Sequence, residues 1–238
     1  ETFISDHATT ARPFYLQVGF KETHRHGPRG FPDVNQEDSE RVVVPRWLKD
    51  DDGARAELAG FQSDLRRLDQ AIGRIMTALD RNSLTENTLV VCTTDHGIPF
   101  PRAKATLYDP GLEVMLIVRW PQGGISGGWR CDTLIRGVDM TPTILDLLGM
   151  AIPATVQGRS VARAWLGEAL ADVPVFAENN FHAYFDPSRA IRTQNRKLIV
   201  NFASTKAFYD ASQAYRPKCT PVHPENPRNA KHPLVELY

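Results

Sequence analysis

The chain has 238 residues, 42% of them hydrophobic, and its 28 basic and 28 acidic side chains give a formal net charge of zero. This length allows one sizeable core with a small appended region, since single domains commonly run to about 200–250 residues. The balanced charge excludes a global positive field that would recruit nucleic acid or an anionic membrane, so any anion site must be local. No apolar stretch approaches the roughly 18 residues needed to cross a bilayer. Cys92, Cys131 and Cys219 are too few and too scattered for a disulfide framework or a zinc site.

The first third of the chain predicts one strand, one loop and one long helix. Residues 13–20 predict a buried strand that opens with Pro and ends shortly before His24. Residues 27–45 carry Gly, Pro and many charges without periodicity, which predicts a surface loop. From Asp52 onward apolar residues recur every three or four positions, the period of one helical face, and predict a long amphipathic helix. These residues are Leu58, Phe61, Leu65, Leu68, Ile72, Ile75, Met76 and Leu79.

The middle of the chain predicts two more strands, over residues 87–94 and 114–120, joined by a Pro-containing loop over residues 98–111. The order strand, helix, strand favours a parallel sheet with covering helices. Residues 139–149 predict a short helix, with Pro near its first position and Gly at its end.

The last part of the chain predicts a second, smaller layer with strands over residues 173–178 and 190–202, while residues 216–233 hold five prolines and predict coil. We therefore expect an α/β three-layer sandwich with a mainly parallel sheet over residues 1–152. A smaller α+β C-terminal region is expected over residues 153–238.

The run Thr-Thr-Asp-His-Gly at residues 93–97 carries the strongest chemical signal. It follows an apolar stretch, as do ligands delivered to the carboxyl edge of a sheet. A carboxylate there is costly to bury unless it is paired, hydrogen-bonded or metal-bound, so Asp95 predicts a metal ligand, with a cap or a structural ion pair as the alternative. His96, between Asp95 and Gly97, is a candidate second ligand, although a lone His is more often a surface or core residue. Gly97 lets another group approach the backbone closely.

Two further residues extend this candidate site. His24 also follows a predicted strand, so parallel topology would bring it to the same sheet edge as Asp95. Lys104 stands eight residues beyond His96, and a cation there suits a site that binds a tetrahedral oxyanion. The alternative for Lys104 is a solvated lysine.

These motifs resemble the sulfatase family of the alkaline phosphatase superfamily, in particular its heparan N-sulfatase branch. The likeness runs through residues 13–24, 93–120, 139–149 and 189–202, and its most similar runs are 98–101, 141–146 and 185–189. The resemblance implies an alkaline phosphatase-like fold. It also implies hydrolysis of a sulfate ester or sulfamate, with a sulfated carbohydrate such as a glycosaminoglycan, or another small sulfate ester, as substrate.

The resemblance further implies roles for single residues. Asp95 and His96 fall where sulfatases place two ligands of a calcium ion; Zn²⁺ or Mn²⁺ is the alternative, because imidazole suits these metals better. Lys104 falls on a cation that contacts the sulfate. His24 falls on a sulfate-contacting histidine that can also donate a proton toward the leaving group, so both residues are candidate catalytic groups.

In the smaller region, His182 and Arg189 are candidate substrate contacts by position, with surface or salt-bridge roles as the alternative. The resemblance also suggests an exported, periplasmic or lysosomal location.

Sulfatases attack sulfur with a formylglycine made from the Cys of a Cys-x-Pro-Ser-Arg motif, and none of the three cysteines fits this motif. The aspartate pair that would complete the calcium site is also absent. We therefore expect the central and C-terminal part of a sulfatase, with formylglycine in a preceding segment. Because calcium takes about six to eight oxygen ligands, two residues hold it poorly, and we expect little or no sulfatase activity from this polypeptide alone.

Two other functions remain as alternatives. One is a metal-dependent phosphodiesterase or phosphonate hydrolase, in which Thr or Ser is the nucleophile and zinc replaces calcium, since related phosphodiesterases also use Asp-His-Gly. The other is a noncatalytic sulfated-glycan binder that has lost the nucleophile.

Overall fold

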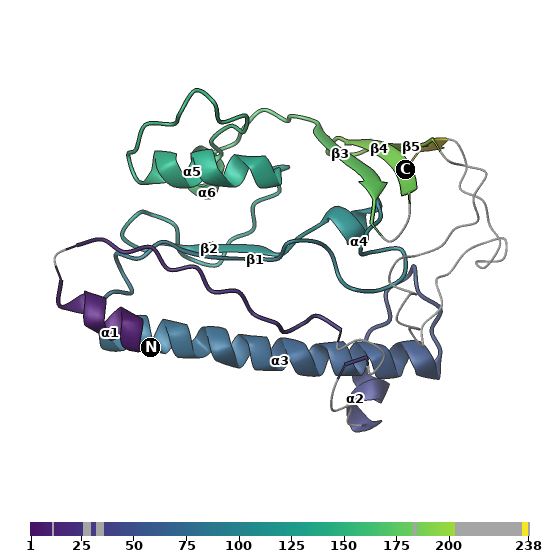
Figure 1. The fold of residues 1–238 in the computed structure, drawn as a ribbon, viewed down its shortest axis with the longest axis horizontal. Coiled ribbons are helices and arrows are strands. Elements are labelled where there is room, and N and C mark those ends of the chain that lie inside the picture. The colour runs from purple at the N-terminus through teal and green to yellow at the C-terminus, as the bar shows by residue number, and fades with distance from the viewer. Residues whose placement is uncertain (11, 26–29, 32–35, 183–184, 203–234, 238) are drawn as a thin grey trace.

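The computed structural model describes residues 1–10, 12–25, 30–31, 36–182, 185–202 and 235–237. It combines helices with antiparallel strands, and its longest element is a single helix, α3 (Figure 1). None of the helices in this described part has the length and apolar character needed to span a bilayer.

Helix α3, Asp52–Arg81, confirms the helix predicted from the apolar period. Its first turn is capped by Asp51, whose carboxylate accepts a hydrogen bond from Ala54 N at 2.9 Å. The first half of α3 buries an apolar face that includes Leu58 and Phe61, and this face packs with Phe100 from the loop after β1. Helix α3 therefore forms the support for the segments that carry the candidate site.

Two short helices lie against α3. Helix α1, Thr2–Ala8, buries Ile4 in a cluster with Ala78 and Leu79 from the last turns of α3. Helix α2, Gln36–Arg41, is joined to α3 by an ion pair of 2.9 Å between Asp38 and Arg66. Part of the predicted loop over residues 27–45 is thus helical.

Strands β1, Val90–Thr93, and β2, Leu116–Arg119, pair antiparallel, with Thr93 opposite Leu116. The expected parallel pairing is not what the described strands show. A parallel pair needs a crossover connection, usually a helix that carries the chain back along the sheet. Here the connection holds only α4, Asp109–Leu112, and closes on itself where Gly97 N donates to Gly111 O at 3.0 Å. The chain returns to the strand end that it left, and antiparallel pairing follows.

The predicted buried strand over residues 13–20 is wrong for the described part of the chain. These residues form an unpaired stretch after α1, and Tyr15 is 80% exposed (Figure 1). Leu16, Val18 and Phe20 are exposed as well. A strand needs a hydrogen-bonded neighbour, and the described residues supply none here.

The predicted helix after residue 139 is confirmed as η2, Gly137–Asp139, followed by α5, Met140–Leu147. Asp139 is 1% exposed, and its carboxylate binds the Arg136 guanidinium at 2.7 Å and accepts from Arg159 N at 2.9 Å. The short helix α6, Ala162–Trp165, packs beside α5. Asp139 therefore anchors two loops at the start of α5.

The C-terminal sheet has four antiparallel strands in the order β3-β4-β5-β6. Their bounds are Val175–Phe181, Phe185–Arg192, Lys197–Asn201 and Val235–Leu237. Ala190 and Ile199 on one face pack with Leu107 and α4, so this sheet rests on the loop after β1. The predicted coil over residues 216–233 lies outside the described residues.

Candidate functional site

Lys104 lies in a compact loop, residues 97–111, here called the Lys104 loop. The loop is closed by the hydrogen bond from Gly97 N to Gly111 O, and Lys104 N donates to Ile98 O at 3.1 Å. A Cβ on Gly97 would lie 1.8 Å from Pro110 O, so only glycine allows this approach of backbone to backbone. The sequence indicated such an approach at Gly97, and the geometry confirms it.

The backbone on both sides of Lys104 is in the left-handed region. Arg102 has φ 60° and Ala105 has φ 63°, values that residues with a side chain seldom adopt. Such strain costs on the order of 1–3 kcal/mol per residue and is found preferentially at ligand clamps and active sites. Stacking of Arg102 over the Tyr108 ring, 4.3 Å from its centroid, helps to hold the conformation.

The Lys104 ammonium is a cation on this held loop. The side chain is half-buried, and within the described part of the chain it has no hydrogen-bond or ion-pair partner. A cation on a held backbone, with no anionic partner among the described residues, is suited to bind an anion.

His24 is exposed and ends the stretch that follows α1. Its backbone N donates to Lys21 O at 3.0 Å, which forms a turn. Its Nδ1 lies 2.8 Å from Arg25 O. A carbonyl oxygen can only accept, so Nδ1 carries the proton and Nε2 is the nitrogen left for a ligand.

A buried residue beside His24 joins the two segments. Arg25 Nε donates to Pro99 O at 2.9 Å across 74 positions of sequence. The stretch that ends in His24 is therefore held against the Lys104 loop. The structure brings these segments together without a hydrogen bond between the His24 and Lys104 side chains themselves.

Asp95 and His96 lie directly after β1, as expected, but the carboxylate is not buried: the Asp95 side chain is 88% exposed. One of its oxygens accepts from His96 N at 3.1 Å, and the other lies 3.7 Å from His96 Nε2. Neither residue has a hydrogen bond or ion pair to His24 or Lys104 in the described structure. The cost of burial therefore does not apply to Asp95, because water solvates the carboxylate.

The fit of a metal ion to this position is incomplete. Asp95 offers exposed carboxylate oxygens, and His96 offers one ring nitrogen because its Nδ1 lies 2.6 Å from Gly97 O. The described residues contain no group of three or more His, Cys, Asp or Glu side chains that could hold an ion. These two residues alone do not make a calcium site, so no chemical step is assigned to a metal here.

The two candidates in the C-terminal sheet have no hydrogen bond or ion pair to these groups within the described residues. His182 is exposed just after β3. Arg189 in β4 forms a 3.2 Å ion pair with Glu178 on β3 and donates to Asn179 O at 3.2 Å. The structure thus shows the salt-bridge role for Arg189, and substrate contact by either residue stays a prediction.

Several residues that hold the site carry no local sequence signal. Arg25 and its partner Glu57 come from segments far apart in sequence. Lys197 in β5 is buried and binds Asp109 of α4 at 2.9 Å, which ties the C-terminal sheet to the end of the Lys104 loop. Burial lowers the pKa of the Lys197 ammonium, and the bond to Asp109 offsets part of this effect. No local pattern marks such long-range pairs.

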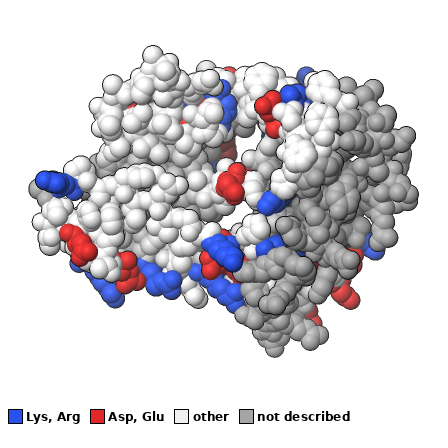
Figure 2. All heavy atoms as spheres, in the orientation of Figure 1, with Lys and Arg blue, Asp and Glu red and all other residues white. Residues whose placement is uncertain are grey.

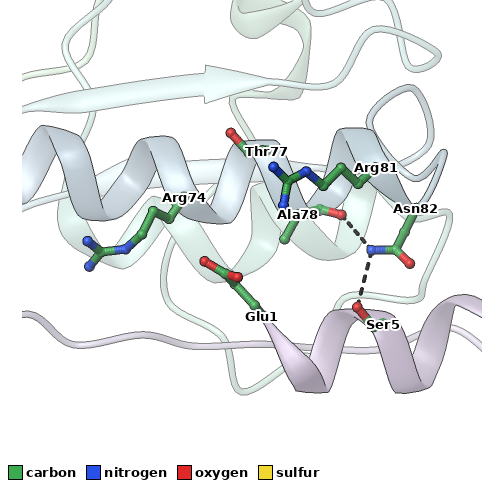
Figure 3. A pocket seen from close by; sticks show the side chains of 7 residues that line it. All are labelled: Glu1, Ser5, Arg74, Thr77, Ala78, Arg81 and Asn82. Atoms are coloured by element: carbon green, nitrogen blue, oxygen red, sulfur yellow. Dashed lines mark hydrogen bonds between the residues drawn. The ribbon is translucent and has the colours of Figure 1, made fainter.

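A pocket of about 320 Å³ lies elsewhere, between α1 and the last turns of α3 (Figure 3). Its wall includes Glu1, Arg74 and Arg81, and it contains none of the six predicted site residues. On the face shown in Figure 2, acidic and basic side chains are interspersed rather than gathered by sign, in keeping with the zero net charge.

Two family models match the chain. Residues 1–150 match the model described as Sulfatase, and residues 100–218 match the model described as N-sulphoglucosamine sulphohydrolase, C-terminal. Human N-sulphoglucosamine sulphohydrolase is 29% identical over 222 residues, a match that covers 80% of this chain and 44% of the human protein. An ulvan-active sulfatase of Formosa agariphila is 27% identical over 166 residues, covering 70% of this chain and 28% of that protein. The chain thus spans less than half the length of these relatives.

Solved structures of low identity share the fold. A protein solved in complex with its substrate D-glucosamine-2-N,6-O-disulfate has a TM-score of 0.56 at 23% identity, covering 72% of this chain and 38% of that one. A phosphonate monoester hydrolase from Silicibacter pomeroyi has a TM-score of 0.54 at 23% identity, covering 76% and 42%. With a family match over more than half of its residues, the chain belongs to the sulfatase family.

Proposed function

We propose that this chain supplies part of the sulfate site of an enzyme that hydrolyses a sulfate ester or sulfamate on a sulfated sugar. The observation that carries the proposal is the hydrogen bond from Arg25 Nε to Pro99 O, 2.9 Å, which holds the His24 segment against the Lys104 loop. The relatives named for N-sulphoglucosamine and for ulvan support a sulfated carbohydrate as the substrate class.

Each of the two residues has a role that its surroundings allow. The Lys104 ammonium binds a nonbridging sulfate oxygen and offsets the negative charge on it, which lowers the barrier most where charge develops in the transition state. His24, with Nδ1 engaged by Arg25 O, presents Nε2. When protonated, Nε2 donates a hydrogen bond to the sulfate or a proton to the departing group.

The metal and the nucleophile are proposed from the family. Sulfatases use a metal ion and a formylglycine. We assign Asp95 and His96 as two ligands of that metal, Ca²⁺ in the first place and Zn²⁺ or Mn²⁺ as the alternative. The remaining ligands and the formylglycine are expected in an N-terminal segment outside these 238 residues. His182 and Arg189 are retained as candidate contacts to the sugar.

For the whole protein we propose the alkaline phosphatase-like three-layer sandwich with a mainly parallel sheet. In it, residues 1–152 belong to the catalytic domain and residues 153–238 form the smaller C-terminal region. The likeness to solved structures at TM-scores of 0.54 and 0.56 supports this fold.

Release of inorganic sulfate tests the function. The natural gene product that contains this sequence is assayed on N-sulfated and 6-O-sulfated glucosamine, beside the variants Lys104→Ala and Lys49→Ala. Lys49 is an exposed lysine outside the Lys104 loop and serves as the matched control. We expect sulfate release, a loss of about a hundredfold or more in kcat/KM for Lys104→Ala, and no change for Lys49→Ala. Equal activity of the two variants would contradict the role of Lys104.

Hydrolysis of a phosphonate or phosphate ester is the second candidate. The observation that favours it is His96 beside Asp95, since an imidazole with a carboxylate suits zinc or manganese better than calcium. A phosphonate monoester turned over faster than both sulfated sugars would support this candidate. Binding of a sulfated sugar without turnover of any ester would indicate a sulfated-glycan binder instead.

A further inference from the structure

We infer that Arg25 is a positioning residue whose buried guanidinium couples His24 to the Lys104 loop and so sets the spacing of the two groups proposed to contact sulfate. The chemical meaning of this inference rests on the proposed function. The coupling itself is a property of the folded chain and can be tested without substrate.

The Arg25 guanidinium is held in one place from several sides. The residue is 5% exposed, and its Nη1 forms an ion pair with Glu57 of α3, which is also buried. The charged plane lies over two aromatic rings, 4.8 Å from the centroid of Phe31 and 5.1 Å from that of Phe100. Opposite charge and ring faces together fix both the position and the plane of the guanidinium.

From this fixed plane, Arg25 Nε reaches the Lys104 loop at a point close to Lys104 itself. It donates to Pro99 O at 2.9 Å. The preceding carbonyl, Ile98 O, accepts the backbone N–H of Lys104 at 3.1 Å. Arg25 is therefore linked to the Lys104 backbone through two hydrogen bonds and the peptide unit between them. His24 directly precedes Arg25 in the chain, so the same guanidinium is close to both residues.

No other hydrogen bond or ion pair of the described residues links the His24 segment to the Lys104 loop. The hydrogen bonds of residues 15–23 stay within residues 15–24: Tyr15 binds Gln17 at 3.2 Å, and Lys21 O accepts from His24 N at 3.0 Å. The same residues are largely exposed and belong to no strand. Without the Arg25 contacts, His24 would end a stretch with no other polar link to the loop.

Lysine cannot reproduce this arrangement. Arg25→Lys keeps a positive charge for Glu57 but replaces a planar fork with a single ammonium. One nitrogen cannot occupy the place of Nη1 at Glu57 and that of Nε at Pro99 O together. A second variant, Arg25→Met with Glu57→Gln, removes both buried charges at once and leaves no charge stranded. Arg66→Lys is the matched control, because Arg66 is an exposed arginine of α3 that pairs with Asp38.

The test measures coupling and binding separately on the full chain. NMR of the His24 ring and of the Lys104 amide reports position, and titration with inorganic sulfate reports binding. We expect both Arg25 variants to shift both signals and to weaken sulfate binding by about fivefold or more, and Arg66→Lys to do neither. In a Lys104→Ala background, Arg25→Lys should lose most of its effect on sulfate, as expected for residues that act together.

The outcomes separate the two proposals. Folded Arg25 variants whose His24 and Lys104 signals stay in place would overturn the coupling. An equal loss of sulfate binding with and without Lys104 would also refute the positioning role, because a general loss of stability acts independently of Lys104. Shifted signals in a protein that binds no sulfate would uphold the coupling and reject the proposed function.

Discussion

Alanine at position 97 should loosen the Lys104 loop at its closure. A Cβ there would lie 1.8 Å from Pro110 O and 2.7 Å from Pro110 C, and ordinary contact begins at 3.4 Å. The facing backbone must therefore retreat by about 1.6 Å, which breaks the hydrogen bond from Gly97 N to Gly111 O, now 3.0 Å long. Loss of this bond costs about 1 kcal/mol, and overpacking adds about 1–3 kcal/mol. We expect Gly97→Ala to lower the free energy of unfolding by about 2–4 kcal/mol.

Urea unfolding of the chain measures this change, with Gly73→Ala as the matched control. Gly73 is an exposed residue inside α3, and a Cβ there meets no atom within 4 Å. Both variants lose the same freedom in the unfolded chain, so their difference isolates the clash. Gly73→Ala should raise stability by about 0.5–1 kcal/mol through helix propensity. If Gly97→Ala unfolds within about 0.5 kcal/mol of Gly73→Ala, the loop is not closed as described.

Two further predictions concern buried charges. Burial raises the pKa of Asp139, but hydrogen bonds from Arg136 and Arg159 N outweigh it and leave the pKa below its usual value. The stability that Asp139 contributes is therefore full above about pH 4 and is lost as the pH falls through its lowered pKa. Asp139→Asn should be about 2 kcal/mol less stable at pH 7 in urea unfolding, and it should lack this acid-dependent loss. Burial lowers the pKa of Lys197, so the unfolded chain binds more protons between the lowered value and about 10.4, and stability rises with pH through that range. Lys197→Met should be neutral or stabilising at pH 7, because Asp109 is half exposed and keeps its ion pair with Arg192, and the variant should lack this rise. A clear destabilisation at both pH 7 and pH 10 would contradict the argument.

The elements predicted well from sequence are those whose signal is local. The long helix α3 follows from an apolar period that begins near Asp52. The close approach at Gly97 follows from the lack of a side chain. Each of these features depends on residues that are close together in the sequence.

The features that sequence did not predict depend on partners far away in the chain. Residues 13–20 have the composition of a strand, but strand pairing requires a neighbour that no local pattern specifies. The composition of residues 114–120 predicts this strand correctly, whereas it does not predict the pairing direction of β1 and β2, because that direction is decided by how the connection returns. Arg25 lies in a polar run that carries no local sign of burial, and only its contacts with Glu57 and Pro99 show that it is buried.

The two halves of the candidate site are held in different ways, and this difference bears on how each would bind its ligand. The backbones of His24 and Lys104 are placed by contacts of the segments that carry them, so little backbone ordering remains when an anion binds. The Asp95 side chain is 88% exposed, and its hydrogen bond and ion pair within the described part of the chain are with its neighbour His96. An ion that binds there must first order this carboxylate and then find its other ligands elsewhere. Within this chain, sulfate affinity should therefore depend on Lys104 and change little when a chelator removes divalent ions.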